Sequence, residues 1–114
     1  MAAMVPELDA KRVRKWASDR TPAEFRKEMR VEVDETPRAL TILECRPPWD
    51  DVMGSDWTRM PIARLSFVKK RNEWTLHWAD RNGRFQRYAE CDPSQHVGEL
   101  LDEIDADPVC IFWG

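Results

Sequence analysis

The sequence predicts an α+β fold in which one antiparallel meander sheet of about five strands packs against N-terminal helices and a C-terminal helix. Three observations carry this prediction. Apolar residues recur at helical spacing up to about residue 29, alternate with polar residues from about 30 to 90, and return to helical spacing after residue 93. With 114 residues and 42% hydrophobic side chains, the chain has the size of a single domain and can bury a core without metal or disulfide support.

The N-terminal segment, residues 7–29, is expected to be helical. Pro6 opens the first helix, and Leu8 and Val13 fall on one side of it. A second, shorter helix is expected to begin at Thr21-Pro22-Ala23-Glu24. This stretch is a capping box, in which the threonine hydroxyl and the glutamate carboxylate satisfy free backbone N–H groups.

The strands are expected between residues 30 and 90. Val31 and Val33 alternate with charged residues, which is typical of a strand with one buried face. The other strands are expected at residues 40–46, 62–68, 73–79 and 85–90. Residues 47–61 form a long connection that contains Trp49 and Trp57. Connections of this length are uncommon in compact domains and are often functional.

The turn Asp80-Arg81-Asn82-Gly83 contains Asn-Gly, the strongest short hairpin signal. A two-residue loop would place His77 opposite Tyr88. A three-residue loop with a glycine bulge would place His77 opposite Arg87 and Leu76 opposite Tyr88. We favour the second register, because it keeps the large apolar residues of both strands on one face.

After the sheet, Asp92-Pro93-Ser94-Gln95 supplies a cap and a proline for a helix at about residues 93–105. Its apolar residues recur at i, i+3, i+4 and i+7, as in an amphipathic helix. Pro108 ends this helix. Residues 109–114 are rich in β-formers, so we expect a final strand or an extended tail held in the core. The expected core comprises Leu8, Val13, Trp16, Phe25, Val31, Val33, Ile42, Leu65, Phe67, Trp74, Leu76, Val97, Leu101, Ile104 and Ile111.

Composition argues against several classes of protein. Charged residues make up 34% of the chain, and no apolar run approaches the roughly 20 residues of a membrane span. The first residues lack the basic and apolar regions of a signal peptide. Cys45, Cys91 and Cys110 are too far apart for a zinc motif and can form at most one disulfide. We therefore expect a cytoplasmic protein with reduced thiols, no metal, no cofactor and no membrane partner, present as a monomer or weak homodimer.

The net charge of −3 is unevenly distributed along the chain. Residues 1–30 carry +3, residues 31–88 carry +1, and residues 89–114 carry −7 with no lysine or arginine. Carboxylates at the end of the last helix oppose its dipole; these are Asp102, Glu103, Asp105 and Asp107. We expect compensation from the basic side of the first helix, formed by Lys11, Arg12, Arg14 and Lys15. The alternatives are a solvated acidic face and a site for a divalent metal or a basic protein.

Several motifs extend over nearly the whole chain from about residue 5. They are Arg46-Pro47-Pro48-Trp49, Pro61-Ile62-Ala63-Arg64, Trp74-Thr75-Leu76-His77-Trp78-Ala79-Asp80-Arg81-Asn82, Arg87-Tyr88, Ile104-Asp105-Ala106-Asp107-Pro108 and Ile111-Phe112-Trp113-Gly114. Together they resemble the small bacterial proteins of domain-of-unknown-function family 3024. His77 and Phe85 depart from that pattern, since an aromatic residue and a tryptophan are expected there. The resemblance implies a cytoplasmic bacterial protein and no particular activity.

Three functions are compatible with this sequence. The first is a non-catalytic binding or adaptor domain that uses a Trp-rich sheet face together with the 47–61 connection. The second is a nucleic-acid-binding module, in which the basic turns 69–71 and 81–87 meet phosphates while bases stack on Trp74 and Trp78.

The third function is an enzyme built from Arg46, His77, Tyr88 and an acid. The sequence leans against catalysis, because it contains no nucleophile–base, phosphate-loop or metalloprotease motif. Across the first two hypotheses we expect the partner to be a protein or a nucleic acid. The candidate binding residues are Arg46, Trp49, Trp57, His77, Trp78, Arg81, Arg84, Arg87, Tyr88 and Trp113.

Overall fold

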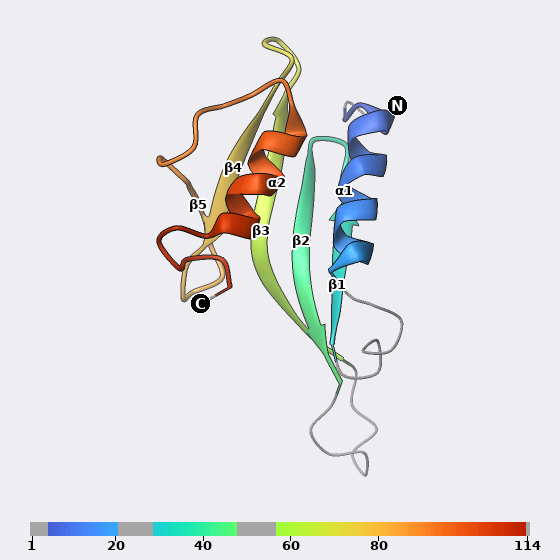
Figure 1. Ribbon diagram of the computed structural model, residues 1–114, viewed down its shortest axis with the longest axis vertical. Helices are drawn as coiled ribbons and strands as arrows, with labels where there is room; N and C mark the ends of the chain where they lie inside the picture. The colour runs from blue at the N-terminus through green and yellow to red at the C-terminus, as the bar shows by residue number, and fades with distance from the viewer. Residues whose placement is uncertain (1–4, 21–28, 48–56, 114) are drawn as a thin grey trace.

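The computed structural model describes residues 5–20, 29–47 and 57–113, and shows two helices on one face of a five-stranded sheet (Figure 1). The elements are α1 (Glu7–Asp19), β1 (Arg30–Glu35), β2 (Ala39–Arg46), β3 (Thr58–Val68), β4 (Glu73–Ala79), β5 (Phe85–Arg87) and α2 (Val97–Ala106). The strands follow one another in sequence order, and every neighbouring pair is antiparallel. The predicted α+β class with a meander sheet is therefore confirmed.

Helix α1 packs through Ala10, Val13, Trp16 and Ala17, all of which are buried. The prediction that Leu8 belongs to the core is wrong, because its side chain is 76% exposed. At about 100° per residue, Leu8 lies roughly 140° around the helix from Val13 and so faces away from the sheet. The expected capping-box helix and Phe25 fall at 21–28, outside the described residues.

The β4–β5 hairpin has the three-residue register that we favoured. His77 lies opposite Arg87, and the Tyr88 N–H donates to the Leu76 carbonyl at 2.9 Å. Gly83 adopts a φ of +78°, the left-handed conformation that closes such a loop. The Asp80 carboxylate accepts hydrogen bonds from two backbone N–H groups of the loop at 2.9 Å each. Strand β5 ends at Arg87 rather than at residue 90, and the next residue, Tyr88, is buried and donates its hydroxyl to Glu103 of α2 at 3.1 Å.

Strand β3 begins at Thr58, earlier than the expected residue 62. Its first residues pair with β2, and a bulge at Ile62 allows the ladder to continue past Pro61. The long connection therefore contributes part of its length to the sheet. Residues 48–56, which include Trp49, lie outside the described residues.

Helix α2 begins at Val97, later than the cap and proline at 92–95 predicted. Ser94 is instead paired with β4, since its N–H and carbonyl bond to Trp74 at 3.0 and 2.7 Å. The Ser94 hydroxyl accepts from the His96 N–H at 3.0 Å and donates to Glu99 at 2.7 Å. Because Ser94 pairs with β4, the chain stays extended there, and α2 begins later than the sequence predicted.

The C-terminal tail forms no strand in residues 109–113 but folds back beneath α2. Asp107, at a φ of 41°, accepts hydrogen bonds on its carboxylate from the backbone N–H groups of Ile111, Phe112 and Trp113 at 2.8, 3.1 and 2.9 Å. These bonds outweigh the effect of burial, which would raise the pKa of Asp107, and hold that pKa below its ordinary value. The tail is held in the core through one side chain: Phe112 is buried, whereas Trp113 and Cys110 are exposed.

The two ends of the chain meet through charge at Asp105, one of the acids that we expected, but the basic partner is not one of those that we expected. Arg20 pairs with Asp105, and the Trp16 indole N–H donates to the same carboxylate at 3.0 Å. Arg14 instead binds Glu7 and Glu35, and Lys15 binds Asp19. Burial raises the pKa of Asp105, but the bonds and charge from Arg20 and Trp16 outweigh it and lower that pKa.

Candidate functional site

One row of residues crosses the whole sheet on the face turned away from the helices. Asp34 lies opposite Thr41, Thr41 opposite Arg64, Arg64 opposite His77, and His77 opposite Arg87. Directly opposed residues of neighbouring strands point to the same face. We call Asp34, Thr41, Arg64, His77 and Arg87 the cross-strand row; its acid lies at the β1 end and its basic residues lie on β3, β4 and β5.

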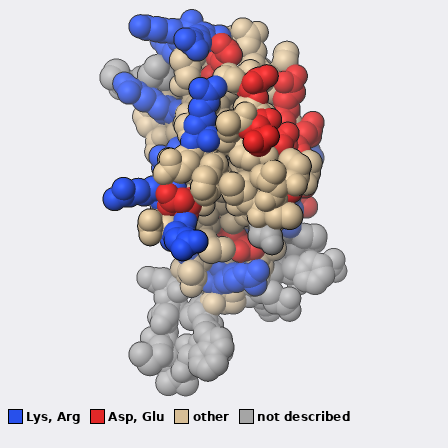
Figure 2. Space-filling model, turned by 90° about the vertical axis from the view of Figure 1, so that its left-hand side faces the viewer, with Lys and Arg blue, Asp and Glu red and all other residues tan. Residues whose placement is uncertain are grey.

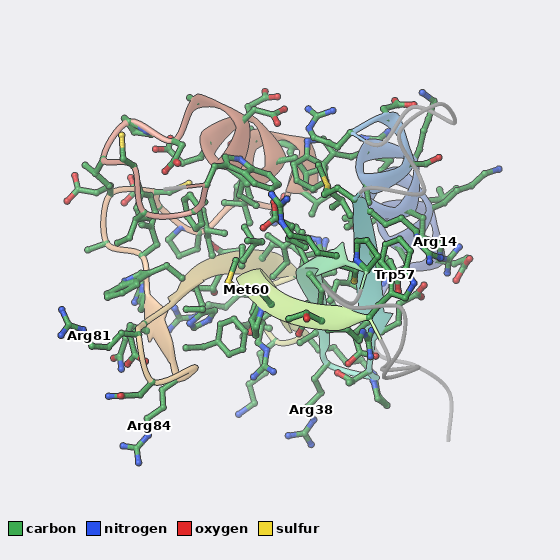
Figure 3. All side chains as sticks on the ribbon, turned by 90° about the horizontal axis from the view of Figure 1, so that it is seen from below. Arg14, Arg38, Trp57, Met60, Arg81 and Arg84 are labelled. Carbon is green, nitrogen blue, oxygen red and sulfur yellow. The ribbon has the colours of Figure 1, made fainter. Side chains whose placement is uncertain are left out.

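The neighbouring row shows which face this is. Leu40, Leu65 and Leu76 oppose one another and are fully buried in the core shared with α1 and α2. Side chains alternate along a strand, so the cross-strand row points to the opposite side. In Figure 3 both helices lie above the sheet, while Arg38 and Arg84 point away from them below it. We call this lower side the open face.

Arg64 is the most firmly held member of the row. Its Nε donates to the Thr41 hydroxyl at 3.1 Å, and its guanidinium carbon lies 4.1 Å from the centre of the Phe85 ring. Thr41 is itself buried, so the anchor is rigid. A neutral hydroxyl and an aromatic ring therefore fix the guanidinium, and within the described part of the chain no carboxylate pairs with it.

His77 lies half-buried between two arginines. Burial, followed by the charges of Arg64 and Arg87, lowers the pKa of His77 below its ordinary value of 6.5. The imidazole is consequently neutral at pH 7. An anion that neutralised the neighbouring arginines would remove part of this shift and favour the protonated ring.

Further cations lie at both ends of β4. Lys69, Lys70 and Arg71 form the β3–β4 turn, and Arg81 and Arg84 belong to the β4–β5 turn. All five are exposed, and none forms an ion pair with the residues that the structure describes. Figure 2 shows lysine and arginine along one flank of the molecule and most of the acids on the other, helix-bearing flank.

The structure separates the two basic turns that the nucleic-acid hypothesis joined. They lie at opposite ends of β4, a strand of seven residues and so roughly 23 Å long (Figure 1). Trp74 cannot stack on a base, because it is fully buried and its indole N–H donates to Asp9 at 2.9 Å. The cross-strand row, with Phe85 beside it, lies between these turns and closer to the β4–β5 turn.

The predicted site residues fall into three places. On or beside the open face lie His77, Arg81, Arg84 and Arg87; on the helix side lie Trp78, Tyr88 and Trp113; and at the far end of β2 and β3 lie Arg46 and Trp57. Trp49 is outside the described residues. The Trp-rich sheet face of the adaptor hypothesis is thus the inner face, which the helices cover.

The enzyme hypothesis required groups that do not converge. His77 faces the open side, whereas Tyr88 is buried on the inner side and donates to Glu103 at 3.1 Å. Burial and the Glu103 carboxylate raise the pKa of Tyr88 to about 12, so its hydroxyl stays protonated. Arg46 pairs with Glu44 at the end of β2. In the described parts of the chain, no group of three or more His, Cys, Asp or Glu could hold a metal ion.

A groove of about 360 Å³ lies on the helix side, between the tail and the β4–β5 turn. Met60 and Trp113, exposed by 51% and 38%, line it together with Ile111 and Phe112. Trp113 leans on Trp16 at 6.3 Å between ring centres and donates to the Ile104 carbonyl at 2.9 Å. The adaptor hypothesis predicted an apolar binding surface, and this groove is now the candidate for that surface.

Sequence reasoning missed Arg64, Thr41 and Phe85. It placed His77 opposite Arg87, but it did not align β2, β3 and β4 with one another. The signal was available in part, because Arg64 stands between the apolar residues Ala63 and Leu65, and His77 stands between Leu76 and Trp78. Their alignment depends on the ladders that join β3 to both of its neighbours.

No helix in the described parts of the chain is long and apolar enough to cross a membrane. No curated protein and no solved structure matches this chain. The family model of the domain of unknown function DUF3024 matches residues 2–114. The chain therefore belongs to the DUF3024 family, as its sequence motifs indicated.

Proposed function

We propose that this domain is a non-catalytic module that binds nucleic acid on the open face of its sheet. The observation that carries the proposal is the cross-strand row, in which Arg64 and Arg87 flank His77 without an acid partner among the described residues. Both guanidinium charges are kept, one on each side of the neutral imidazole of His77. A row of this kind is useful to the protein when an anion neutralises it.

The spread of the cations favours a polymer over a small anion. Cationic side chains occur at the β3–β4 turn, in the row near the end of β4 and at the β4–β5 turn, so they lie at both ends of this strand. A single phosphate would meet one of these groups, whereas a chain of phosphates meets all of them. Arginine suits such a ligand, because its planar guanidinium can bind phosphate oxygens in pairs.

The overall acidity of the chain does not oppose this function. The net charge of −3 includes seven acids at residues 89–114, which belong to α2 and its flanking segments. Those acids lie mostly on the flank opposite the basic one (Figure 2). The local field of the open face, rather than the net charge, governs the encounter with a polyanion.

A binding titration tests the proposal. We expect a fluorescein-labelled oligothymidylate to bind, with an affinity that falls steeply between about 50 and 200 mM salt. The double variant Arg64→Gln/Arg87→Gln should bind at least about tenfold more weakly. It should also lower the slope of log affinity against log salt by about 1.4, because two phosphate contacts are lost.

The matched control is Lys11→Gln/Arg12→Gln, which removes the same charge from the exposed side of α1. It should bind the oligonucleotide almost as tightly as the wild type. No binding at low salt would overturn the proposal, and so would equal losses in the control and in the row variant.

A further inference from the structure

We infer that the ligand is single-stranded nucleic acid and that one of its bases stacks on the pair formed by Arg64 and Phe85. This inference rests on the proposed function, and it names the strand type and the residues that recognise a base. Its starting point is that Phe85 is the aromatic residue next to Arg64 on the open face, half-buried, with the guanidinium over its ring.

The pair offers a flat platform of defined orientation. The guanidinium carbon lies 4.1 Å from the ring centre, and the Thr41 hydroxyl holds Nε at 3.1 Å. Bases stack on aromatic rings and on arginine planes in single-strand-binding proteins. Because Arg64 is already oriented, a base gains this contact without first ordering a long side chain.

The neighbouring groups supply the backbone contacts of a strand. Arg87 is exposed and lies two residues beyond Phe85 on β5, on the same face, and His77 lies directly between Arg87 and Arg64. A nucleotide whose base lies on the platform would bring its phosphates to Arg87 and to the β4–β5 turn. The aromatic residue and the cations therefore stand in the arrangement that single-strand binding requires.

A duplex does not fit this arrangement. Its bases are stacked on one another and present only their edges, so none can lie flat on Arg64 and Phe85. Helix or ribbon elements that enter a major groove would have to project from the open face, and both described helices lie on the other side. Readout by stacking therefore points to unpaired bases.

The test compares three probes of equal length on three proteins. The probes are oligothymidylate, an abasic oligonucleotide with the same phosphates, and a duplex; the proteins are the wild type, Phe85→Leu and Phe85→Trp. The wild type should bind oligothymidylate about tenfold more tightly than the abasic probe, since stacking contributes on this scale for each base. Phe85→Leu should bind both single strands alike, at the weaker level, and Phe85→Trp should restore the preference.

Folding of each variant is checked by its circular dichroism and melting temperature, and Met60→Leu, at an exposed apolar site of the groove, is the control. In Phe85→Trp, quenching of the new indole by oligothymidylate but not by the abasic probe would report stacking directly. Equal binding of abasic and thymidylate probes by the wild type would overturn the stacking inference and leave the nucleic-acid proposal standing. Tighter binding of the duplex would also overturn it, and failure of all three probes would overturn the proposed function itself.

Discussion

Arg14 and Arg20 of the helix layer have carboxylate partners, whereas Arg64 on the open face has neutral partners. Arg14 is held by Glu7 and Glu35, and Arg20 by Asp105. On the open face Arg64 is held by a hydroxyl and a ring. A guanidinium paired with a carboxylate contributes to stability and is already neutralised, whereas one oriented by neutral groups keeps its charge for a ligand. The helix layer therefore holds these two arginines in ion pairs, whereas Arg64 has no carboxylate partner among the described residues, although Arg59 pairs with Glu32 at 3.9 Å elsewhere on the open face.

The largest effect is expected on the helix side, at Phe112. This ring is buried 5.0 Å from the Tyr88 ring, between centres, although it lies near the end of the chain. Phe112→Ala should lower the free energy of unfolding by about 3 kcal/mol, through lost burial and the cavity left behind. Urea denaturation measures this change, with the exposed Val109→Ala as a control that should be nearly neutral. An unchanged midpoint for Phe112→Ala would mean that the tail does not belong to the core.

The next effect is expected at Asp107, which binds three backbone N–H groups of the tail. Asp107→Asn keeps the size of the side chain but offers one acceptor oxygen, so we expect a loss of about 1–2 kcal/mol. The wild type should also lose this contribution in acid. The pKa of Asp107 is lowered in the fold, so its stabilisation is complete above the ordinary value near 3.8 and disappears as the pH falls through the folded value.

Thermal unfolding from neutral pH down to about pH 2 checks this sign. Below the ordinary pKa, the difference between wild type and Asp107→Asn should shrink. Asp105→Asn serves as a comparison, because the pKa of that carboxylate is lowered by the side chains of Arg20 and Trp16 rather than by the tail. A difference between wild type and Asp107→Asn that stayed constant across the whole range would contradict the account of the tail.

A smaller effect, on the pH dependence of stability, is expected at His77 on the open face. Its pKa is lowered in the fold, so the unfolded chain binds more protons as the pH falls through about 6.5. Stability should therefore rise with pH across and just below that value, and His77→Gln should flatten this rise. Bound oligonucleotide should reverse the trend, since phosphates favour the protonated ring and affinity should increase as the pH falls. Affinity that stayed constant between pH 5 and 7.5 would place the ligand away from His77.

The smallest effect on stability is expected in the row itself. Arg87→Gln removes an exposed charge that repels its neighbours and has no ion-pair partner in the described chain, so the free energy of unfolding should change by less than about 0.5 kcal/mol. Arg20→Gln removes a charge paired with Asp105 and should be clearly more destabilising. Melting temperatures of the two variants compare the faces directly. A larger loss of stability from Arg87→Gln than from Arg20→Gln would contradict this difference between the two faces.

Local patterns were sufficient to predict much of the fold. The switch of period from 3.6 to 2 predicted the α+β class. Asn82-Gly83 predicted the hairpin, and the need to keep the large apolar residues on one face predicted its register. Predictions failed where a tertiary contact decided the outcome. Ser94 pairs with Trp74, so α2 begins later than predicted. Asp105 pairs with Arg20 and not with the basic side of the first helix that we had expected.

The candidate site was harder to predict than the fold. His77 and Arg87 were named and correctly paired, but Arg64 comes from another strand, and its place in the row depends on the β3–β4 register. The tryptophans misled the search for a binding face, because large aromatic residues in a small domain mostly fill its interior. Trp74 is the clearest case, as it is fully buried.

Binding of nucleic acid on the open face is seen residue by residue in a nuclear magnetic resonance titration of the ¹⁵N-labelled protein with oligothymidylate. We expect the amide shifts that change with saturating behaviour to cluster on β3, β4 and β5, around Arg64, His77, Phe85 and Arg87. The amides of α1 and α2 should remain nearly unchanged. Shifts confined to the helices or to the groove beside Trp113, or no shifts at low salt, would contradict the account.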